Sequence, residues 1–263
     1  MNFLPGKSNK KRLQNYLMHR YQILIEYVGT SFVGWQIQKR GTSIQKVVQI
    51  TLSKLLKQKI LLYGSGRTDS GVHALAQSAH FDIKNKIQNI DKIIKSLNYF
   101  LNNKMISIID IKRKKNNFHA RYSAKERIYL YIIRNRLSPS ILNKDREWHI
   151  RKKLDLNLIK KGSKKLIGKH DFSTFRSSNC SAKSPVRTIN EVIISKSKDQ
   201  IKIKFKSKSF LKNQVRSMVG CLKYLGEKKW SLEKFAEIIK MKDRRKVAPP
   251  APAHGLYLEK IIY

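Results

Sequence analysis

Alternating hydrophobic and polar positions predict four strands in the first part of the chain, at residues 20–28, 59–63, 77–83 and 105–111. Two segments between them carry apolar residues at helical spacing, and Thr42 with Gln45 forms a capping box that starts the first helix. The element order is therefore βαββαβ. The apolar helix faces are Ile44, Val47, Val48, Thr51, Leu52, Leu55 and Leu56 in the first helix, and Ile93, Ile94, Leu97, Phe100 and Leu101 in the second.

The second part of the chain repeats this order. It contains a strand at 126–133, a helix near 155–166, a hairpin of strands at 187–195 and 200–208, and a last strand at 255–263. A helix before that strand has Val215, Met218, Val219, Leu222 and Leu225 on one side, and a further helix at 231–241 is inserted after it.

Two tandem βαββαβ units predict an α+β protein with two ferredoxin-like halves, of the topology that RNA-recognition modules use. We expect the halves to span 19–117 and 118–263 and to form one extended antiparallel sheet with a central cleft. The two halves are not visibly alike in sequence, so the alternative is one irregular α+β domain.

The composition adds a strong positive charge to this fold. The 263 residues include 57 Lys and Arg against 17 Asp and Glu, which gives a net charge of +40. Such a surplus favours a polyanionic partner, above all nucleic acid, although an A/T-biased coding sequence would also enrich Lys. Residues 1–18 are basic without the apolar core of a signal peptide, and we expect a flexible arm that contacts RNA.

The two cysteines, Cys180 and Cys221, lie far apart and outside any metal-ligand spacing. This usage is typical of a reducing, cytoplasmic compartment. No apolar run is long enough to span a membrane.

The stretch GSGRTDSGVHA, residues 64–74, holds the most informative acid of the chain, Asp69. A Gly-, Asp- and Ser-rich link between strands is often only a turn. This link is longer than a hairpin needs, and Arg67 and His73 flank the acid. An opposite charge nearby favours an ionised carboxylate, which suits a nucleophile or an electrostatic stabiliser better than a proton donor.

The sequence lacks the residues that glycoside hydrolysis, metal-dependent catalysis and nucleotide cofactors require. No second acid stands in comparable surroundings for glycoside hydrolysis, and the histidines show no metal-ligand spacing. There is no P-loop and no GxGxxG motif, so we expect neither a metal nor an organic cofactor.

Tyr129 and Tyr131 alternate with aliphatic residues on strand 126–133 and share one face. They are either packed at the sheet surface or form a base-stacking platform. The basic residues just before them, Arg121, Lys125 and Arg127, are candidates for phosphate contacts. Arg216, at the rim of an apolar helix face, is a candidate partner for a buried anion such as Asp69, although a lone arginine there usually reaches to water.

Seven stretches, taken in order, resemble the TruA-type tRNA pseudouridine synthases over nearly the whole chain. They are GTSFVGWQIQ (29–38), GSGRTDSGVHALAQSAHFD (64–82), FHARYSAKERIYLYII (118–133), HDFSTFR (170–176), SPVRTI (184–189), FLKNQVRSMVG (210–220) and APAHGLYL (251–258). The chain departs from the family in its basic N-terminal extension and in Gln214, where relatives often carry Met.

The resemblance implies a cofactor-free homodimer that converts uridine to pseudouridine in the anticodon stem-loop of tRNA, at positions 38, 39 and 40. It implies that Asp69 is the catalytic aspartate and that Arg67 helps to flip the uridine out of the stack. Tyr129 would stack on the flipped base and assist proton removal, and Arg216 would pair with Asp69 and hold it ionised. His73, Arg121, Lys125 and Arg127 complete the expected substrate-binding set.

Two other functions stay open on the sequence. One is a catalytically silent tRNA-binding or chaperone protein that uses the same cleft. The other is a base-removing hydrolase, which the lack of a second carboxylate disfavours.

Overall fold

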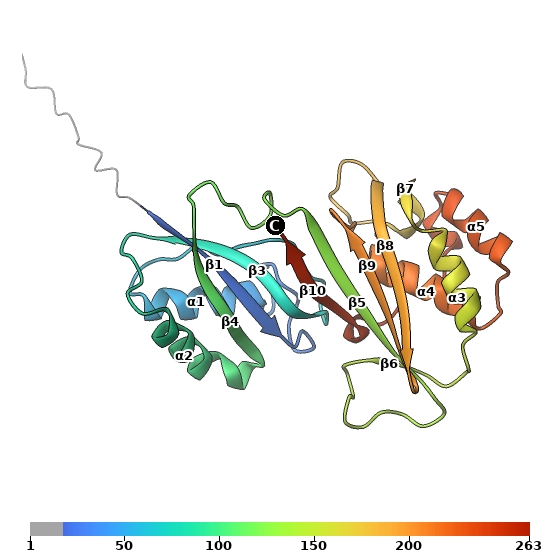
Figure 1. The fold of residues 1–263 in the computed structure, drawn as a ribbon, viewed down its shortest axis with the longest axis horizontal. Helices are drawn as coiled ribbons and strands as arrows, with labels where there is room; N and C mark the ends of the chain where they lie inside the picture. Colours follow the sequence, from blue (N-terminus) through green and yellow to red (C-terminus); the bar gives the residue numbers. More distant parts are fainter. Residues whose placement is uncertain (1–17) are drawn as a thin grey trace, which may run out of the picture.

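A computed structural model describes residues 18–263, and Figure 1 shows one continuous sheet with helices against it. The strand order is β4-β1-β3-β10-β5-β9-β8-β7, with β2 paired to β3 and β6 to β5. The strands are β1 (His19–Tyr27), β2 (Tyr63–Gly64), β3 (His73–Ile83), β4 (Ile106–Lys114), β5 (Glu126–Asn135), β6 (Trp148–Ile150), β7 (Gly168–Asp171), β8 (Val186–Ser197), β9 (Gln200–Ser207) and β10 (Leu256–Ile262).

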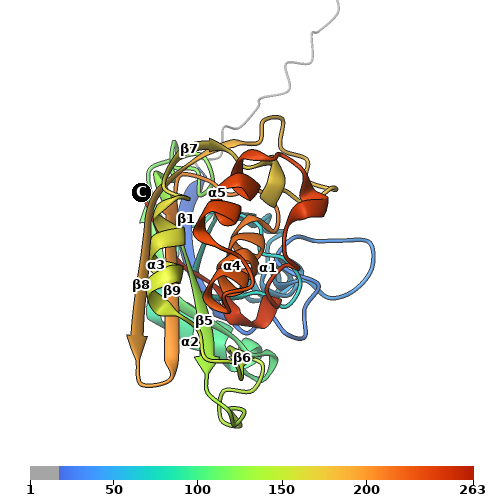
Figure 2. The same cartoon turned by 90° about the vertical axis from the view of Figure 1, so that its right-hand side faces the viewer.

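The helices lie on one side of this sheet, as the turned view in Figure 2 shows for α4 and α5 against β8 and β9. They are α1 (Ile44–Leu55), α2 (Ile90–Leu101), α3 (Leu156–Lys164), α4 (Gln214–Gly226) and α5 (Leu232–Lys240). Within the described residues, the strand orders β4-β1-β3-β2 and β10-β5-β9-β8 each reproduce the ferredoxin-like arrangement. The predicted fold of two ferredoxin-like halves is confirmed.

The last strand joins the two halves. β10 pairs with β5 in the antiparallel sense, and with β3 in the parallel sense through Tyr257 opposite His73 and Leu258 opposite Ala74. The sheet is therefore mostly, but not entirely, antiparallel. Each half has its own apolar core under its helices, and Tyr129 of β5 packs against both cores. The junction of the halves consequently lies beside this side chain.

Some local predictions were wrong. Helix α1 is capped by Ser43 rather than Thr42: Ser43 is extended, and its Oγ accepts a hydrogen bond from the Lys46 amide. The Gln45 side chain instead bridges the Ile37 amide and the Leu62 carbonyl. On α2, Phe100 is 54% exposed because it packs edge-to-face on Tyr99 at the surface and not on the core.

Strand boundaries differ where pairing partners are remote in sequence. β2 is only two residues long, whereas β3 begins at His73, four residues earlier than expected, because its first residues pair with β1 and β10. β6 and β7 were not predicted. The expected N-terminal arm lies outside the described residues, and no helix within 18–263 is long and apolar enough to cross a membrane.

Candidate active site

The loop from Ser65 to Val72, which we call the catalytic loop, connects β2 to β3 and is held by buried hydrogen bonds. The Thr68 hydroxyl lies 2.7 Å from the Tyr27 hydroxyl, and the Thr68 carbonyl accepts from the Trp35 amide at 3.1 Å. Gln77 bonds both the Ser65 hydroxyl and the Gly66 carbonyl. The extra residues of this link therefore form an ordered, hydrogen-bonded loop and not a loose connection between two strands.

A second loop, residues 29–43, packs its backbone directly on the catalytic loop. A Cβ added to Gly29 would lie 1.9 Å from the Val72 carbonyl oxygen, and one added to Gly34 would lie 2.5 Å from that of Thr68. Gly34 also has a φ of +105°, which a residue with a side chain rarely adopts. Only glycine fits at these two contacts, so the two loops behave as one unit.

Asp69 is partly buried and faces the start of α4 across the junction of the halves. Burial raises the pKa of its carboxyl above the ordinary value, while the charges of Arg216 and Lys212 and a backbone hydrogen bond from Asn213 lower it. The neighbouring cations act in the direction expected from the sequence, but burial outweighs them in the net shift of the pKa. The site is thus a desolvated carboxylate, whose ionised form depends on the neighbouring cations.

Arg216 lies near Asp69 without forming a direct ion pair with it. Its Nε donates to the Ala251 carbonyl at 2.8 Å, and its Nη1 donates to the Asn213 side chain at 3.3 Å. Arg216 therefore acts on the pKa of Asp69 through its charge, while these two contacts fix its position. Arg216, the expected partner of Asp69, thus lies nearby, but in the free protein its guanidinium is hydrogen-bonded to the Ala251 carbonyl.

Tyr129 completes the group from the sheet side. Its hydroxyl donates to the Arg67 carbonyl at 3.5 Å, and its ring meets Phe210 edge-to-face at a centroid distance of 5.2 Å. Burial and the charge of Asp69 raise the pKa of Tyr129 well above its usual range. The side chain is therefore a neutral phenol and a hydrogen-bond donor at neutral pH, which disfavours a role as a base in the free protein.

Arg67 and Arg127 have different environments. Arg67 is exposed, and no hydrogen bond or ion pair to another residue of 18–263 holds its guanidinium. Arg127 donates to the backbone carbonyls of Ser65, Arg121 and Lys208. Its guanidinium thereby fastens the catalytic loop to the segments on either side, whereas Arg67 is available to a substrate.

Of the remaining candidates, Arg121 and Lys125 are exposed, whereas His73 is not. His73 is 1% exposed, its Nδ1 accepts from the Gly29 amide, and its Nε2 donates to the carbonyls of Asp145 and His254. Burial lowers its pKa to about 4, which matches this neutral tautomer. His73 anchors the end of the catalytic loop and is not placed to touch a substrate.

Sequence reasoning missed three neighbours of Asp69 and Tyr129, namely Phe210, Lys212 and Asn213. All three lie in the stretch FLKNQVRSMVG, from which only Arg216 was selected. These residues lie directly before helix α4, and the start of that helix faces Asp69 in the other half. Only the tertiary fold shows this proximity, so the sequence did not single them out.

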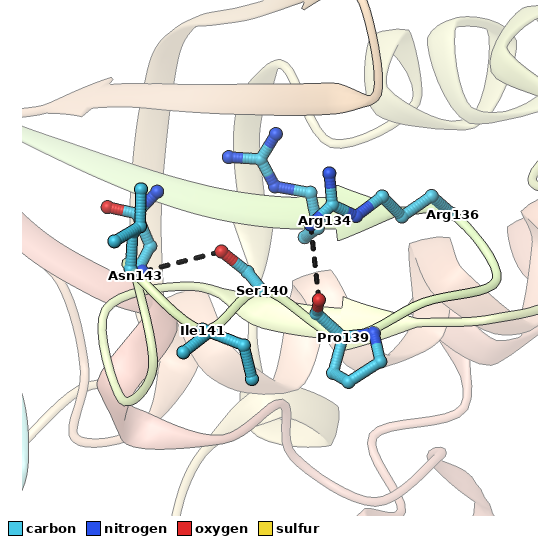
Figure 3. Close-up of a pocket in the computed structure, with 7 residues that line it drawn as sticks. Arg134, Arg136, Pro139, Ser140, Ile141 and Asn143 are labelled. Atoms are coloured by element: carbon cyan, nitrogen blue, oxygen red, sulfur yellow. Dashed lines mark hydrogen bonds between the residues drawn. The ribbon is translucent and has the colours of Figure 1, made fainter.

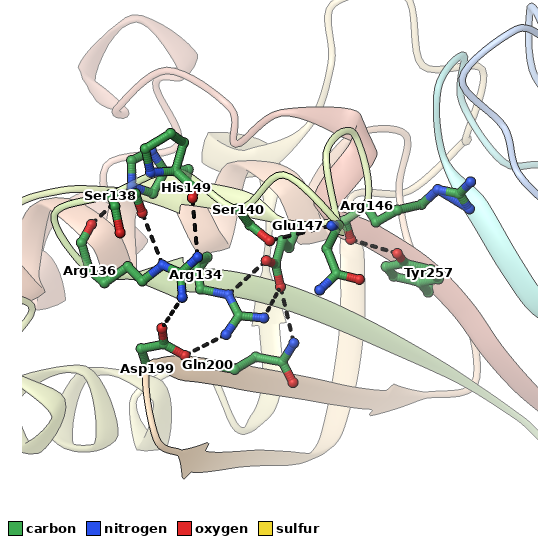
Figure 4. Close-up of polar contacts among 12 residues, drawn as sticks. Arg134, Arg136, Ser138, Ser140, Arg146, Glu147, His149, Asp199, Gln200 and Tyr257 are labelled. Carbon is green, nitrogen blue, oxygen red and sulfur yellow. Dashed lines mark hydrogen bonds and ion pairs between the residues drawn. The ribbon is translucent and has the colours of Figure 1, made fainter.

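A polar network joins the segment between β5 and β6 to the end of β5 and the start of β9 (Figure 4). Glu147, with a side chain 2% exposed, accepts from Arg134 at 2.7 Å and from Gln200 at 3.0 Å, and Arg134 also pairs with Asp199. The small pocket in Figure 3, lined in part by Arg136 and Ile141, opens beside this network. Neither contains a predicted site residue, so we assign the network to holding this segment in place.

Within 18–263, no three His, Cys, Asp or Glu side chains gather as metal ligands. What the fold brings together is a desolvated carboxylate, two cations and a phenol at the junction of two RNA-recognition-like halves, on a chain of charge +40. These features define the class as an enzyme that acts on nucleic acid.

Comparison with known proteins narrows this class. The sequence profile described as tRNA pseudouridine synthase matches residues 23–123 and 163–263. The chain is 63% identical over 246 residues to tRNA pseudouridine synthase A of Pelagibacter ubique (strain HTCC1062), covering 94% of this chain and 100% of the relative. It is 42% identical to tRNA pseudouridine synthase A of Paramagnetospirillum magneticum (strain ATCC 700264 / AMB-1), covering 94% of this chain and 96% of the relative. The chain belongs to the tRNA pseudouridine synthase family, which confirms the resemblance.

Proposed function

We propose that this chain isomerises uridine to pseudouridine in the anticodon stem-loop of tRNA, at positions 38, 39 and 40, without a cofactor. The observation that supports this most is the position of Asp69, partly buried, under the charges of Arg216 and Lys212 and beside Tyr129. A carboxylate in that setting is strongly reactive when ionised, because little water remains to solvate it.

The reaction needs such an anion. The bond between C1′ and N1 of uridine breaks, the uracil turns, and a bond forms between C1′ and C5; the C5 proton leaves and N1 gains a proton. The Asp69 carboxylate acts on the sugar or the base, either as the nucleophile at C1′ or C6, or by stabilising charge while a glycal-like intermediate forms. Both routes require the ionised form, which Arg216 and Lys212 favour.

The base must leave the RNA stack before it reaches Asp69, at a cost of a few kcal/mol. Arg67, an exposed residue of the catalytic loop, takes the place that the uridine vacates. Tyr129 offers its ring to the flipped uracil and its hydroxyl as a donor. Stacking on an aromatic ring contributes about 1–3 kcal/mol per base, which offsets much of the flipping cost.

The RNA backbone meets the exposed cations Arg121 and Lys125 beside the catalytic loop. Because tRNA is the substrate in this proposal, we place the protein in the cytoplasm. We also propose that it works as a homodimer, since one subunit can hold the body of an elongated tRNA while the other receives the anticodon arm.

Release of tritium from uridine labelled at C5 tests the proposal, because bond formation at C5 expels the label. A tRNA transcript with uridine at position 38, 39 or 40 should release one tritium per modified site. The matched transcript with cytidine at these positions should release none. No release from any tRNA, with binding retained, would make the chain a tRNA-binding protein instead.

A further inference from the structure

An aromatic cluster beside the catalytic loop has no role in the chemistry above. It runs from Tyr63 of β2 through His80 of β3 to His119 and Tyr122, and we call it the aromatic platform. The ring centroids are 5.1 Å apart for Tyr63 and His80, 4.5 Å for His80 and His119, and 4.3 Å for His119 and Tyr122. Its last member, Tyr122, is 76% exposed.

We propose that Tyr122, at the open end of this platform, stacks on an unpaired nucleobase of the RNA substrate near the flipped uridine. The inference rests on the proposed function and adds a base-binding site to it. An exposed tyrosine alone does not indicate a binding site; the rigid backbone that carries Tyr122, its position beside the catalytic loop and the charges around it do.

The segment that presents Tyr122 is held rigidly by its own polar groups. His119 Nδ1 accepts from the amides of Arg121 and Tyr122, and the His119 carbonyl accepts from the Ser123 amide. The Ala120 amide donates to His80, and the Ala120 carbonyl accepts from the Tyr263 hydroxyl. The backbone that carries the exposed ring is therefore preorganised, which reduces the entropy cost of binding.

The platform lies next to the catalytic loop. One nitrogen of Arg127, Nη2, donates both to the Ser65 carbonyl at 2.8 Å and to the Arg121 carbonyl at 3.0 Å. The backbone just before Tyr122 and the backbone two residues before Arg67 are thus bridged by a single atom. Because the two segments are bridged, an RNA whose uridine flips at Asp69 brings the nucleotides on either side of it toward the Tyr122 ring.

The charges around the ring fit a nucleic acid. The Arg121 guanidinium lies 5.7 Å from the centre of the Tyr122 ring, and Lys125 is exposed on the same segment. Burial and the charges of Arg20 and Arg121 lower the pKa of His119, so the imidazole beneath Tyr122 is neutral. A ring that already attracts a guanidinium over it suits a base with its attached phosphate, since the ring can stack on the base while Arg121 and Lys125 meet the phosphate.

Equilibrium binding and steady-state kinetics of the full chain with a tRNA transcript test the inference. Tyr122→Ala should raise both Kd and KM for tRNA about tenfold, with little change in kcat. Tyr122→Phe, which keeps the ring, should bind as the wild type does. Tyr99→Ala is the matched control, because Tyr99 is 82% exposed on α2 and belongs to no part of the proposed site.

The salt dependence of binding separates stacking from phosphate contact. Tyr122→Ala should leave the slope of log Kd against log salt unchanged, whereas Arg121→Ala should reduce it by about one. An affinity of Tyr122→Ala equal to that of Tyr99→Ala would overturn the inference, as would an equal loss in Tyr122→Phe. Tritium release by the wild type tests the proposed function separately, because the binding result stands whether or not the label is released.

Discussion

Gly29→Ala should damage catalysis without touching a catalytic side chain. The added Cβ would lie 1.9 Å from the Val72 carbonyl oxygen, whereas ordinary van der Waals contacts begin at 3.4 Å. The two backbones must therefore separate by about 1.5 Å, the difference between these distances. Val72 donates its amide to the Asp69 carbonyl at 3.1 Å, so the displacement reaches Asp69, the proposed catalytic carboxylate.

A misplacement of about 1 Å costs about 100-fold in rate when a reaction depends on the position of the attacking group. We expect kcat for tritium release to fall by about that factor, while Kd for tRNA changes by less than about threefold because phosphate contacts dominate affinity. Single-turnover release at saturating enzyme measures the first quantity, and filter binding measures the second.

Gly66→Ala is the matched control within the same loop. Its Cβ would meet only Arg127 Nε, at an ordinary 3.7 Å, and the position requires no positive φ. This variant should keep a rate near that of the wild type. A folded Gly29→Ala protein with wild-type kcat would refute the reasoning that loop 29–43 sets the position of Asp69; a thermal melt establishes that the variant is folded.

Three further predictions concern charge. Lys212→Ala should move the acid limb of the kcat–pH profile to higher pH: Lys212 lowers the pKa of Asp69, so without it the carboxyl stays protonated to a higher pH, and an unmoved limb would contradict this. Arg134→Met should lower the free energy of unfolding by about 3 kcal/mol in urea titrations, because it leaves buried Glu147 without its main partner. Affinity for tRNA should fall about 1,000-fold between 50 and 200 mM salt if six phosphates are contacted, and a flat dependence would mean that the basic surface does not bind RNA.

The sequence predicted the fold well because each half carries its own periodicity. The apolar faces of α1 and α4 and the alternation in β1 and β5 are local patterns, and they determine the βαββαβ order. The errors concern long-range pairing. β3 begins early because β1 and β10 pair with its first residues, and no pattern near His73 contains that information.

The sequence motifs predicted which side chains would lie near one another, but not the energetics of the group. Asp69, Arg67, Tyr129 and Arg216 were found from their motifs, and the structure brings them to one junction. Burial outweighs the cations in the pKa of Asp69, and Arg216 is anchored on the Ala251 carbonyl. Both facts depend on how deeply side chains are buried and how far apart they lie, which a sequence does not contain. His73 shows the opposite error, since a histidine in a catalytic motif was expected to bind substrate and instead fastens the loop.

The most direct test of the central claim is tritium release by Asp69→Asn, measured beside its affinity for the same tRNA. Asparagine keeps the shape of the side chain and removes the charge, so the fold and the RNA contacts should be retained. The account predicts no release above background with a Kd close to that of the wild type. Release at a rate near that of the wild type would contradict it, because the ionised carboxylate would then not be the group that performs the chemistry.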